Sequence, residues 1–492
     1  MESLLIKQSF YISFLSIFQL LIAFILQFFI IKFFGISESL DIYITSNTIN
    51  LIIVGIATGS LNYAITPIFI KYYKNKQFKT FRNLANSLLN IIFIIFFILA
   101  IVQYLFSSQI TSTIFPGYIN EENILLSELF SIQAFISILT ILTGVLNAIN
   151  YALNNLYRTI VIPIITSVFQ IVFIYFSYEE LGIFSLVYAL AINQLLLLIS
   201  LGAPYIKHYQ FSVKNSRVLK KVYAKTYPLI ISSFFAKSDV LVDRYFASTL
   251  ITGSISILYY GQLLIDSLVA IINKGISLVS LRNFSIIESE RKAFNDYFLN
   301  LYEVVLVIAM FFAIHIIVST DFILEYVLSE AYSTSSEEIS RVYMVTISLI
   351  GIFIGGLVSS VLVNAFYAKG FTALLSKMTI ILQTIGIIFK IIFFKLYGFY
   401  ALPIVMSLKS IIGTGVLIVL YNKNIYRINY RVFLIFFIKV LLLTCTIVIA
   451  ALYLKSLGVG IFLIMLLSTI VYVAYFFKFI KEKLLYYRPR GR

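Results

Sequence analysis

Apolar stretches of twenty residues or more recur from one end of the chain to the other, separated by short polar connections. An α-helix needs about this length to cross the hydrocarbon core of a bilayer. The pattern therefore predicts an all-α polytopic membrane protein with fourteen transmembrane helices. We expect these helices at residues 9–33, 42–70, 84–107, 124–152, 158–178, 183–205, 226–248, 252–284, 297–319, 340–367, 372–395, 398–421, 432–453 and 458–479.

The charges in the connections alternate in sign along the chain. Connection 71–82 has five basic residues, whereas connection 320–338 has five acidic residues and no Lys or Arg. Connection 206–225 is again basic and connection 179–182 is acidic. Basic loops stay in the cytoplasm by the positive-inside rule. The alternation therefore supports fourteen spans and predicts that both termini are cytoplasmic.

Composition narrows the class of protein. Of the 492 residues 61% are hydrophobic and 12% are charged, about half the charged share of a soluble protein. The net charge of +16 lies mostly in the connections, so it indicates topology and anionic membrane lipids as partners rather than nucleic acid. The single cysteine, Cys445, excludes a disulfide framework and a cysteine metal site. No phosphate-binding loop or zinc-protease motif is present, so we expect neither catalytic residues nor a metal.

The two halves of the chain align with an offset of 216 residues, which indicates an internal repeat. The segment "VLNAINYA" (145–152) aligns with "VLVNAFYA" (361–368), and Gly182 aligns with Gly398. Six helices per unit is an even number, so both units enter from the same side and the repeats are parallel, as in alternating-access transporters. We expect an N-terminal six-helix lobe at 1–205, a C-terminal six-helix lobe at 206–425, and two extra helices with a basic tail at 426–492.

Several segments resemble a known family. They are "FFGISESLDIY" (33–43), "IFPGY" (114–118), "GVLNAINYALNNLYRTIVIPIITSVFQIVFI" (144–174) and "LVDRYFASTLITGSISILYYGQLL" (241–264). The chain is similar here to the MurJ/MviN lipid II flippases of the multidrug/oligosaccharidyl-lipid/polysaccharide exporter superfamily. The resemblance implies a fourteen-helix flippase that moves an undecaprenyl-pyrophosphate-linked saccharide from the inner to the outer leaflet of the bacterial cytoplasmic membrane.

The chain departs from this family at three positions where the resemblance implies an arginine: in the first helix, near the middle of the second, and after a Tyr-Tyr pair in the eighth. The first helix here has Gln19 and Gln27 as its polar side chains besides serines, and the second reads "NTINLIIVGIATGS" without a cation. After Tyr259 and Tyr260 comes "GQLL". The N-terminal lobe therefore lacks the usual anion ligands, which leaves the identity of the lipid-linked substrate open.

The predicted seventh span contains four charges within "KSDVLVDRYFAST". A charge at mid-bilayer costs about 2.5–3.5 kcal/mol on insertion scales, so such residues usually face a cavity or a partner. On a helical wheel Lys237 and Arg244 lie about 20° apart, and Asp239 and Asp243 lie on another side about 40° apart. We predict that the two cations bind an anionic substrate. The alternative is that Asp243 and Arg244 lie at the outer interface, where they pair locally or snorkel.

The acidic residues raise the question of a coupling ion. Asp239 and Asp243 are predicted to hold a coupling cation or to pair with Lys377 or Lys409. The resemblance implies that some family members hold sodium through a span-seven aspartate and acidic or amide residues of span eleven. Span eleven here has Lys377 and Gln383 but no acid, and a lysine ammonium could replace the ion. Sodium coupling, proton coupling and transport without a bound ion stay open, and no other cofactor is expected.

Other polar residues within the spans complete the candidate site. Lys274 and Lys409 are predicted to bind substrate, because a cation in lipid needs an anionic partner. For Asp41, which lies near the start of the second helix, the alternative is to cap that helix. For Asn147 and Asn150 the alternative is to join helices by hydrogen bonds. The residues predicted as possible cavity lining are Asp41, Asn147, Asn150 and Gln262.

Together these patterns favour a monomeric flippase for an undecaprenyl-pyrophosphate-linked saccharide such as lipid II. The closest alternative is a flippase for another lipid-linked oligosaccharide, for example an O-antigen or capsule unit, which the missing arginines favour. A drug/cation antiporter is less favoured because twelve helices suffice for it and its cavity usually carries acids. A membrane glycosyltransferase is less favoured because the connections are too short to hold a catalytic domain.

Overall fold

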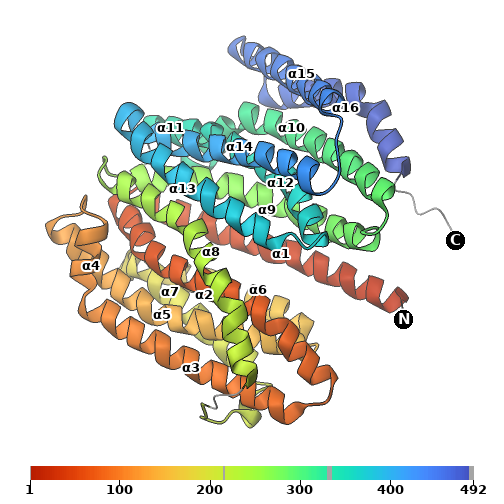
Figure 1. Ribbon diagram of the computed structural model, residues 1–492. Coiled ribbons are helices and arrows are strands. Elements are labelled where there is room, and N and C mark those ends of the chain that lie inside the picture. The colour runs from red at the N-terminus through yellow and green to blue at the C-terminus, as the bar shows by residue number, and fades with distance from the viewer. Residues whose placement is uncertain (1, 214–216, 330–334, 487–492) are drawn as a thin grey trace. The chain divides into compact units, whose positions relative to one another are not determined.

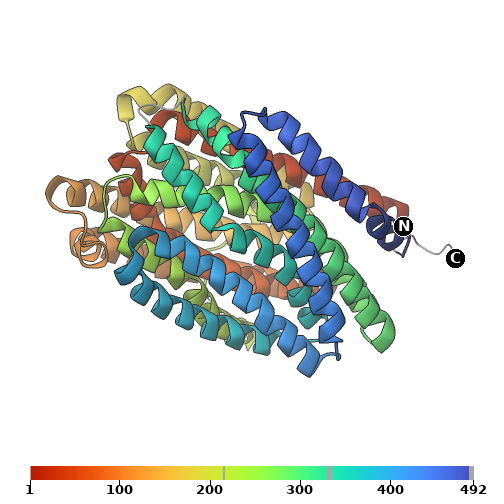
Figure 2. The same ribbon diagram turned by 90° about the horizontal axis from the view of Figure 1, so that it is seen from above.

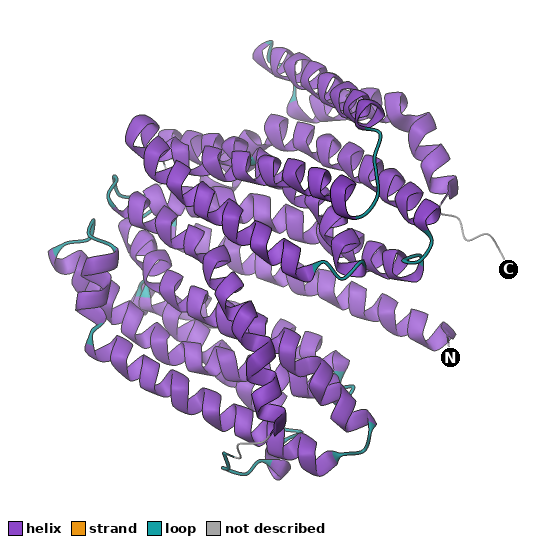
Figure 3. Ribbon diagram, viewed as in Figure 1, coloured by secondary structure: helices purple, strands orange, loops and turns teal. Residues whose placement is uncertain are grey.

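The computed structural model describes residues 2–213, 217–329 and 335–486, and within these ranges the chain is helical without any strand (Figure 3). Parts of three predicted connections, including Arg488, Arg490 and Arg492 of the basic tail, lie outside the described residues. The helices are α1 (Glu2–Phe34), α2 (Glu38–Lys74), α3 (Phe78–Leu105), α4 (Ser107–Ile114), α5 (Asn120–Ala152), α6 (Leu156–Leu181), α7 (Phe184–Gly202), η1 (Ile206–His208), α8 (Arg217–Ser248), α9 (Ser254–Ile286), α10 (Arg291–Ser329), α11 (Ser336–Ser348), α12 (Ile350–Ala368), α13 (Thr372–Tyr397), η2 (Gly398–Tyr400), α14 (Ala401–Asn424), α15 (Tyr430–Ser456) and α16 (Ile461–Tyr486).

Each predicted span coincides with one long helix or, in one case, with two consecutive helices. Eleven apolar segments of the described residues are long enough to cross a membrane, and one of these contains both α13 and α14. The helices α1 and α8 have 33 and 32 residues, which exceeds the length that a bilayer requires. α11 and α12 form a single span interrupted at Leu349, and the short α4, which the pattern did not predict, lies in a connection. The predicted all-α membrane fold is confirmed.

The internal repeat is visible in the helix boundaries. α5 ends at Ala152 and α12 ends at Ala368, and both ends of α6 recur in α13 at the same offset. Gly182 follows α6 with φ 52°, and Gly398 follows α13 with φ 64°. Residues with a Cβ are strained in this left-handed region, so glycine is the natural residue to end both helices. The aligned glycines in the sequence therefore mark the same turn in each repeat.

The described residues form two compact units, one ending at Ser256 and the other starting at Ile257. In unit 1, α2 packs against α5 and α8, α3 packs against α5, and α1 packs against α6 (Figure 1). Its core is apolar, with Phe69 and Phe81 in ring contact at 5.2 Å between centroids. α8 therefore packs within unit 1. The division into lobes at residues 205 and 425 refers to the sequence repeat and stays a prediction.

In unit 2, α12 packs against α10 and α14, and α13 packs against α14. The two C-terminal helices, α15 and α16, lie side by side along α10 (Figure 2). Polar contacts attach them: the Lys455 ammonium pairs with the Asp321 carboxylate, and Tyr472 Oη donates to the Val307 carbonyl at 2.8 Å. A polar group in lipid has to find such partners within the protein. These bonds hold the extra helices on α10.

Close packing of α12 on α14 depends on Gly355. A Cβ added at Gly355 would lie 2.4 Å from Ser410 Oγ, whereas one added at the neighbouring Gly356 would first meet Val269 Cγ1 at 3.4 Å. We expect Gly355→Ala to destabilise the protein by about 1–3 kcal/mol through overpacking, measured as a lower midpoint of heat-induced aggregation in detergent. Gly356→Ala should keep the wild-type midpoint. Equal midpoints for the two variants would contradict this account of the helix interface.

Candidate functional site

Lys237 of α8 lies across the middle of α2. The residue is exposed, and a Cβ added at Gly55 of α2 would lie 3.3 Å from Lys237 Cε. The absence of a side chain at Gly55 therefore leaves the space through which the lysine passes. The Lys237 ammonium places a positive charge beside the middle part of α2, which contains no Lys or Arg of its own. The predicted exposure of Lys237 to a cavity stays a prediction, but its side chain is accessible.

The other three charges of α8 are buried. Asp239 is 5% exposed, Asp243 is fully buried and Arg244 is 3% exposed. Arg244 Nη1 donates to the Ile255 carbonyl at 3.3 Å, so its guanidinium holds the turn between α8 and α9. The alternative is that Arg244 pairs locally or snorkels; the buried side chain does not snorkel, and its bond to the Ile255 carbonyl is a local pairing. The fork of guanidinium donors reaches a backbone carbonyl inside the protein, and a role for Arg244 in substrate binding stays a prediction.

Asp41 caps a helix far away in the sequence. Its Oδ2 accepts from the Gly253 amide at 2.7 Å, and its Oδ1 accepts from the Ser256 amide at 2.6 Å and from the Ser256 hydroxyl. Gly253 directly precedes α9 and Ser256 lies in its first turn, where backbone donors lack helical partners and the helix dipole is positive. Ser37 caps α2, accepting from the Leu40 amide at 3.3 Å. The prediction that Asp41 caps the second helix is therefore wrong: it caps α9.

The loop between α4 and α5 reaches the same place. A Cβ added at Gly117 would lie 1.8 Å from the Ser248 carbonyl oxygen, so the backbones of this loop and the end of α8 touch. Tyr118 Oη lies 3.2 Å from Thr45 Oγ1 in α2, and burial raises the pKa of this phenol above its ordinary value. We call Asp41, Thr45, Gly117, Tyr118 and Ser256 the α9 clamp. It joins the segments "FFGISESLDIY" (33–43) and "IFPGY" (114–118) to the start of α9.

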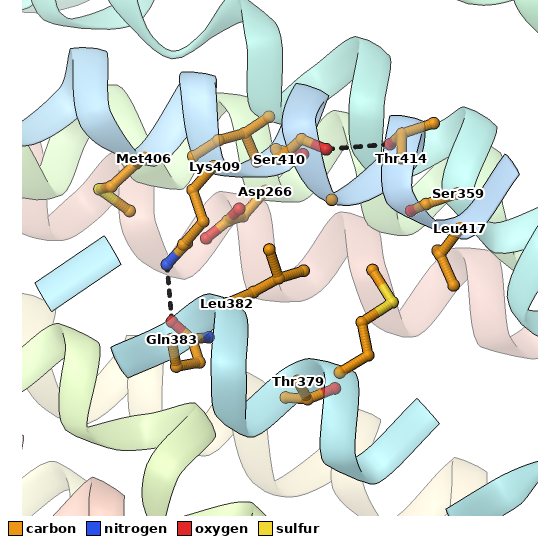
Figure 4. Close-up of a pocket in the computed structure, with 13 residues that line it drawn as sticks. Asp266, Ser359, Thr379, Leu382, Gln383, Met406, Lys409, Ser410, Thr414 and Leu417 are labelled. Atoms are coloured by element: carbon orange, nitrogen blue, oxygen red, sulfur yellow. Dashed lines mark hydrogen bonds between the residues drawn. The ribbon is translucent and has the colours of Figure 1, made fainter. Parts of the chain in front are cut away.

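Unit 2 contains a cavity of about 360 Å³ between α9, α12, α13 and α14, lined by both apolar and polar residues. Its volume is in the range of small-molecule sites. Figure 4 shows that Asp266 and Lys409 point into it from α9 and α14, while Gln383 projects from α13. Hydroxyl groups supply further donors and acceptors. The polar residues of the lining are Asp266, Ser359, Thr379, Gln383, Lys409, Ser410 and Thr414.

α13 holds the Lys409 side chain in place. Lys409 Nζ donates to Gln383 Oε1 at 2.8 Å, and a Cβ added at the buried Gly386 would lie 2.7 Å from Lys409 Cδ. Gln383 thus accepts from the ammonium while Gly386, three residues later on the same face, leaves room for the alkyl stem. We call Gln383 and Gly386 the lysine seat. The predicted cation Lys409 therefore reaches a cavity with a defined orientation.

The remaining predicted residues lie in different surroundings. Lys274 on α9 and Lys377 on α13 are exposed and do not line the unit 2 cavity. Gln262 lies one turn before Asp266 and donates to Met406 Sδ at 3.4 Å, at the edge of this cavity. The proposed pairing of Asp239 and Asp243 with Lys377 or Lys409 stays a prediction, because α8 belongs to unit 1 and the lysines to unit 2.

The two asparagines of α5 differ. Asn150 is 1% exposed, and its Nδ2 donates to the Leu201 carbonyl of α7 at 2.9 Å. It therefore joins two helices and does not line a cavity, which corrects the cavity-lining prediction for this residue. Asn147 lies half-buried one turn earlier, and a lining role for it stays a prediction.

Comparisons with known proteins place this architecture in a family. The family model described as "Lipid II flippase MurJ" matches residues 30–473. The chain belongs to the MurJ family. A "Probable lipid II flippase MurJ" from Buchnera aphidicola subsp. Acyrthosiphon pisum is 24% identical over 292 residues, 56% of each chain. One from Buchnera aphidicola subsp. Baizongia pistaciae is 25% identical over 240 residues, 46% of this chain and 45% of that protein. The chain spans about half the length of the curated relatives it matches.

Solved structures of similar fold include MurJ itself. A "Lipid II flippase MurJ, inward closed conformation" matches with a TM-score of 0.82 and 20% identity, covering 96% of this chain and 100% of that one. An inward-facing multidrug resistance MATE family transporter of the MOP superfamily matches with a TM-score of 0.64 and 14% identity, covering 78% and 90%. At these identities the matches establish the fold. The family resemblance inferred from the sequence is confirmed by the family model.

The sequence analysis of this MurJ-family chain missed two parts of the site. Asp266 lies in an apolar span only eight residues before Lys274, and the same argument that selected the lysine, a charge within lipid, would have selected it. Gly386 gave no signal, because a glycine in a membrane helix is common and its role depends on which side chain of α14 lies opposite.

The α9 clamp predicts a specific loss of stability. Asp41→Ala removes the acceptor of three hydrogen bonds, and leaving buried donors unsatisfied costs about 1–3 kcal/mol. We expect a lower midpoint of heat-induced aggregation for this variant, with Asp41→Asn between it and the wild type. Glu38→Ala, which removes an exposed acid one turn earlier in α2, is the control. If it lowers the midpoint as much as Asp41→Ala, the stabilising role of the clamp is refuted.

Proposed function

We propose that this chain is a flippase that moves a lipid-linked saccharide with an anionic phosphate or pyrophosphate group, such as lipid II, from the inner to the outer leaflet by alternating access. The observation that carries the proposal is the MurJ family match over residues 30–473. The repeated helix boundaries in the two halves of the chain support the pair of bodies that alternating access requires. We propose transport rather than catalysis, with the protein acting as a monomer.

Cations inside the spans support an anionic substrate. Lys237 lies over Gly55 in the middle of α2, the helix in which the family resemblance implies an arginine. Lys409 points into the unit 2 cavity (Figure 4). The two ammonium groups are accessible, and a cation in lipid surroundings is stabilised by an anion. In this proposal α8 and α14 supply part of the anion binding that the missing arginines would otherwise provide.

The α9 clamp supports the alternating part of the mechanism. Its bonds join the first turn of α2, the α4–α5 loop and the turn between α8 and α9. Hydrogen bonds at helix ends can form and break without disturbing the apolar packing along the helices. We propose that this end of the protein is closed when the clamp is formed and opens when the Asp41 contacts to α9 are released.

The membrane potential can supply the driving force. An anionic headgroup that moves outward travels with an inside-negative potential, worth about 2.3 kcal/mol per charge per 100 mV. We therefore propose transport without an obligatory sodium or proton site. The second candidate function is a flippase for another lipid-linked oligosaccharide, and the observation that favours it is the absence of arginine from the second span and from the segment after Tyr259 and Tyr260.

Complementation separates the two candidates. Expressed in a bacterium depleted of its own lipid II flippase, the wild-type chain should restore growth, and Lys237→Met should reduce this rescue. Failure of the wild type to restore growth while it is present in the membrane would refute the lipid II proposal. Rescue of a strain that lacks an O-antigen or capsule flippase would then support the second candidate.

The chain is an integral membrane protein, and we propose the bacterial inner membrane with both termini in the cytoplasm. Basic connections such as 71–82 would face the cytoplasm under this arrangement. Fusions of alkaline phosphatase after Gln77 and after Lys423 should be inactive, because the enzyme needs the oxidising periplasm. A fusion in the α4–α5 connection, after Gly117, should be active. The opposite pattern would invert the topology.

A further inference from the structure

The unit 2 cavity pairs a positioned cation with a carboxylate. Lys409 is held by the lysine seat, with Nζ 2.8 Å from Gln383 Oε1. Asp266 projects from α9 into the same cavity (Figure 4). Of the described residues that line it, Lys409 provides the positive charge and Asp266 the negative one, so the formal charge of the lining is zero. The two opposite charges attract each other.

Because the cavity lining has no net charge, an anionic ligand meets both an attractive and a repulsive group in it. A phosphate that approaches Lys409 is attracted by the ammonium and repelled by the Asp266 carboxylate. It gains the full attraction of the ammonium only when the carboxylate no longer competes for the same cation. Asp266 is exposed in the structure, whereas Lys409 is half-buried and held by α13. The lysine is therefore the fixed partner, and the aspartate is the group that can move away.

We propose that Lys409 is a phosphate-binding group whose resting counter-ion is Asp266, and that the phosphate of the lipid-linked substrate displaces this carboxylate. The inference rests on the proposed function, since it assigns the substrate phosphate to a cavity of unit 2. Release follows from the same competition: the carboxylate returns to the ammonium as the phosphate leaves. The internal counter-ion prevents the cation from binding the anion too tightly to release it.

The dimensions of the cavity determine which part of the substrate enters. A volume of about 360 Å³ is near the lower end of the range for small-molecule sites. It accommodates a pyrophosphate group with its first neighbouring atoms, and the larger saccharide would have to remain outside. Ser410 and Thr379 line the same space, and their hydroxyls can donate to phosphate oxygens. The ligand class is therefore the phosphate group with its lipid attachment, whatever the sugar.

A double-mutant cycle tests the exchange directly. Binding of farnesyl pyrophosphate to the purified full-length protein in detergent would be measured by titration calorimetry. We expect Asp266→Asn to bind roughly tenfold more tightly than wild type, because the competing charge is removed. Lys409→Met should lose most of the affinity. In the Lys409→Met background, Asp266→Asn should have little further effect, because its gain depends on the lysine.

Three results would overturn the proposal: wild-type affinity in Lys409→Met, weaker binding in Asp266→Asn, or the same gain from Asp266→Asn with and without Lys409. The last result would mean that Asp266 repels anions without being the counter-ion of the lysine. The aggregation midpoint of each single variant and of the double variant, measured against wild type, shows whether that variant folds. Lys395→Met, which removes an exposed lysine of α13 outside the lining, should bind as wild type does.

The lysine seat provides an independent variant. Gly386→Ala keeps both charges but places a Cβ 2.7 Å from Lys409 Cδ, so the ammonium has to shift. We expect several-fold weaker binding of farnesyl pyrophosphate, and unchanged binding would show that the seat does not position the lysine. Farnesol, which lacks the phosphate, should give no difference among the variants. If the wild type fails to complement a flippase-depleted strain while this cycle behaves as expected, the proposed function falls and the phosphate site stands.

Discussion

Every polar group within the spans of this protein has to find a partner inside the protein, because the surrounding lipid offers none. This constraint determines the packing of the described helices. Asn150 joins α5 to a carbonyl of α7, and Tyr472 joins α16 to a carbonyl of α10. Arg244 holds the turn between α8 and α9 through the Ile255 carbonyl. Each of these side chains is buried, and each bond specifies which two segments lie together.

The same constraint separates structural charges from accessible ones. Arg244 is buried on a backbone carbonyl and Asp41 is buried on the first turn of α9. Lys237 and Lys409, in contrast, lie in space left by a glycine on the facing helix, Gly55 and Gly386. A glycine opposite a lysine lets the long stem lie flat against the helix while the ammonium remains accessible. Two of the cations that we propose to bind substrate therefore share this arrangement.

The two units use different polar chemistry. Unit 1 contains the α9 clamp, in which backbone amides donate to one carboxylate. Unit 2 has a cavity with a cation, a carboxylate and an amide on three helices. A transporter has to bind its substrate and also release it, and a charged site with an internal counter-ion satisfies both requirements. The clamp and the cavity thus place hydrogen-bonded and charged groups in separate parts of the chain.

The sequence by itself determined the membrane class, the fourteen spans and the offset of the repeat. These follow from properties of neighbouring residues: the length of an apolar run, the sign of charge in a connection and a glycine required at a left-handed turn. It also selected Lys409 and Lys237 as charges that needed a partner.

The tertiary structure decided the partners. Asp41 meets donors 212 and 215 residues away, and Lys409 meets Gln383 because α13 and α14 pack in one particular register. Hydropathy and the helical wheel describe one helix at a time and contain no information about which helix lies opposite. The capping role of Asp41, the burial of Arg244 and the shared cavity of Asp266 and Lys409 all depend on that choice.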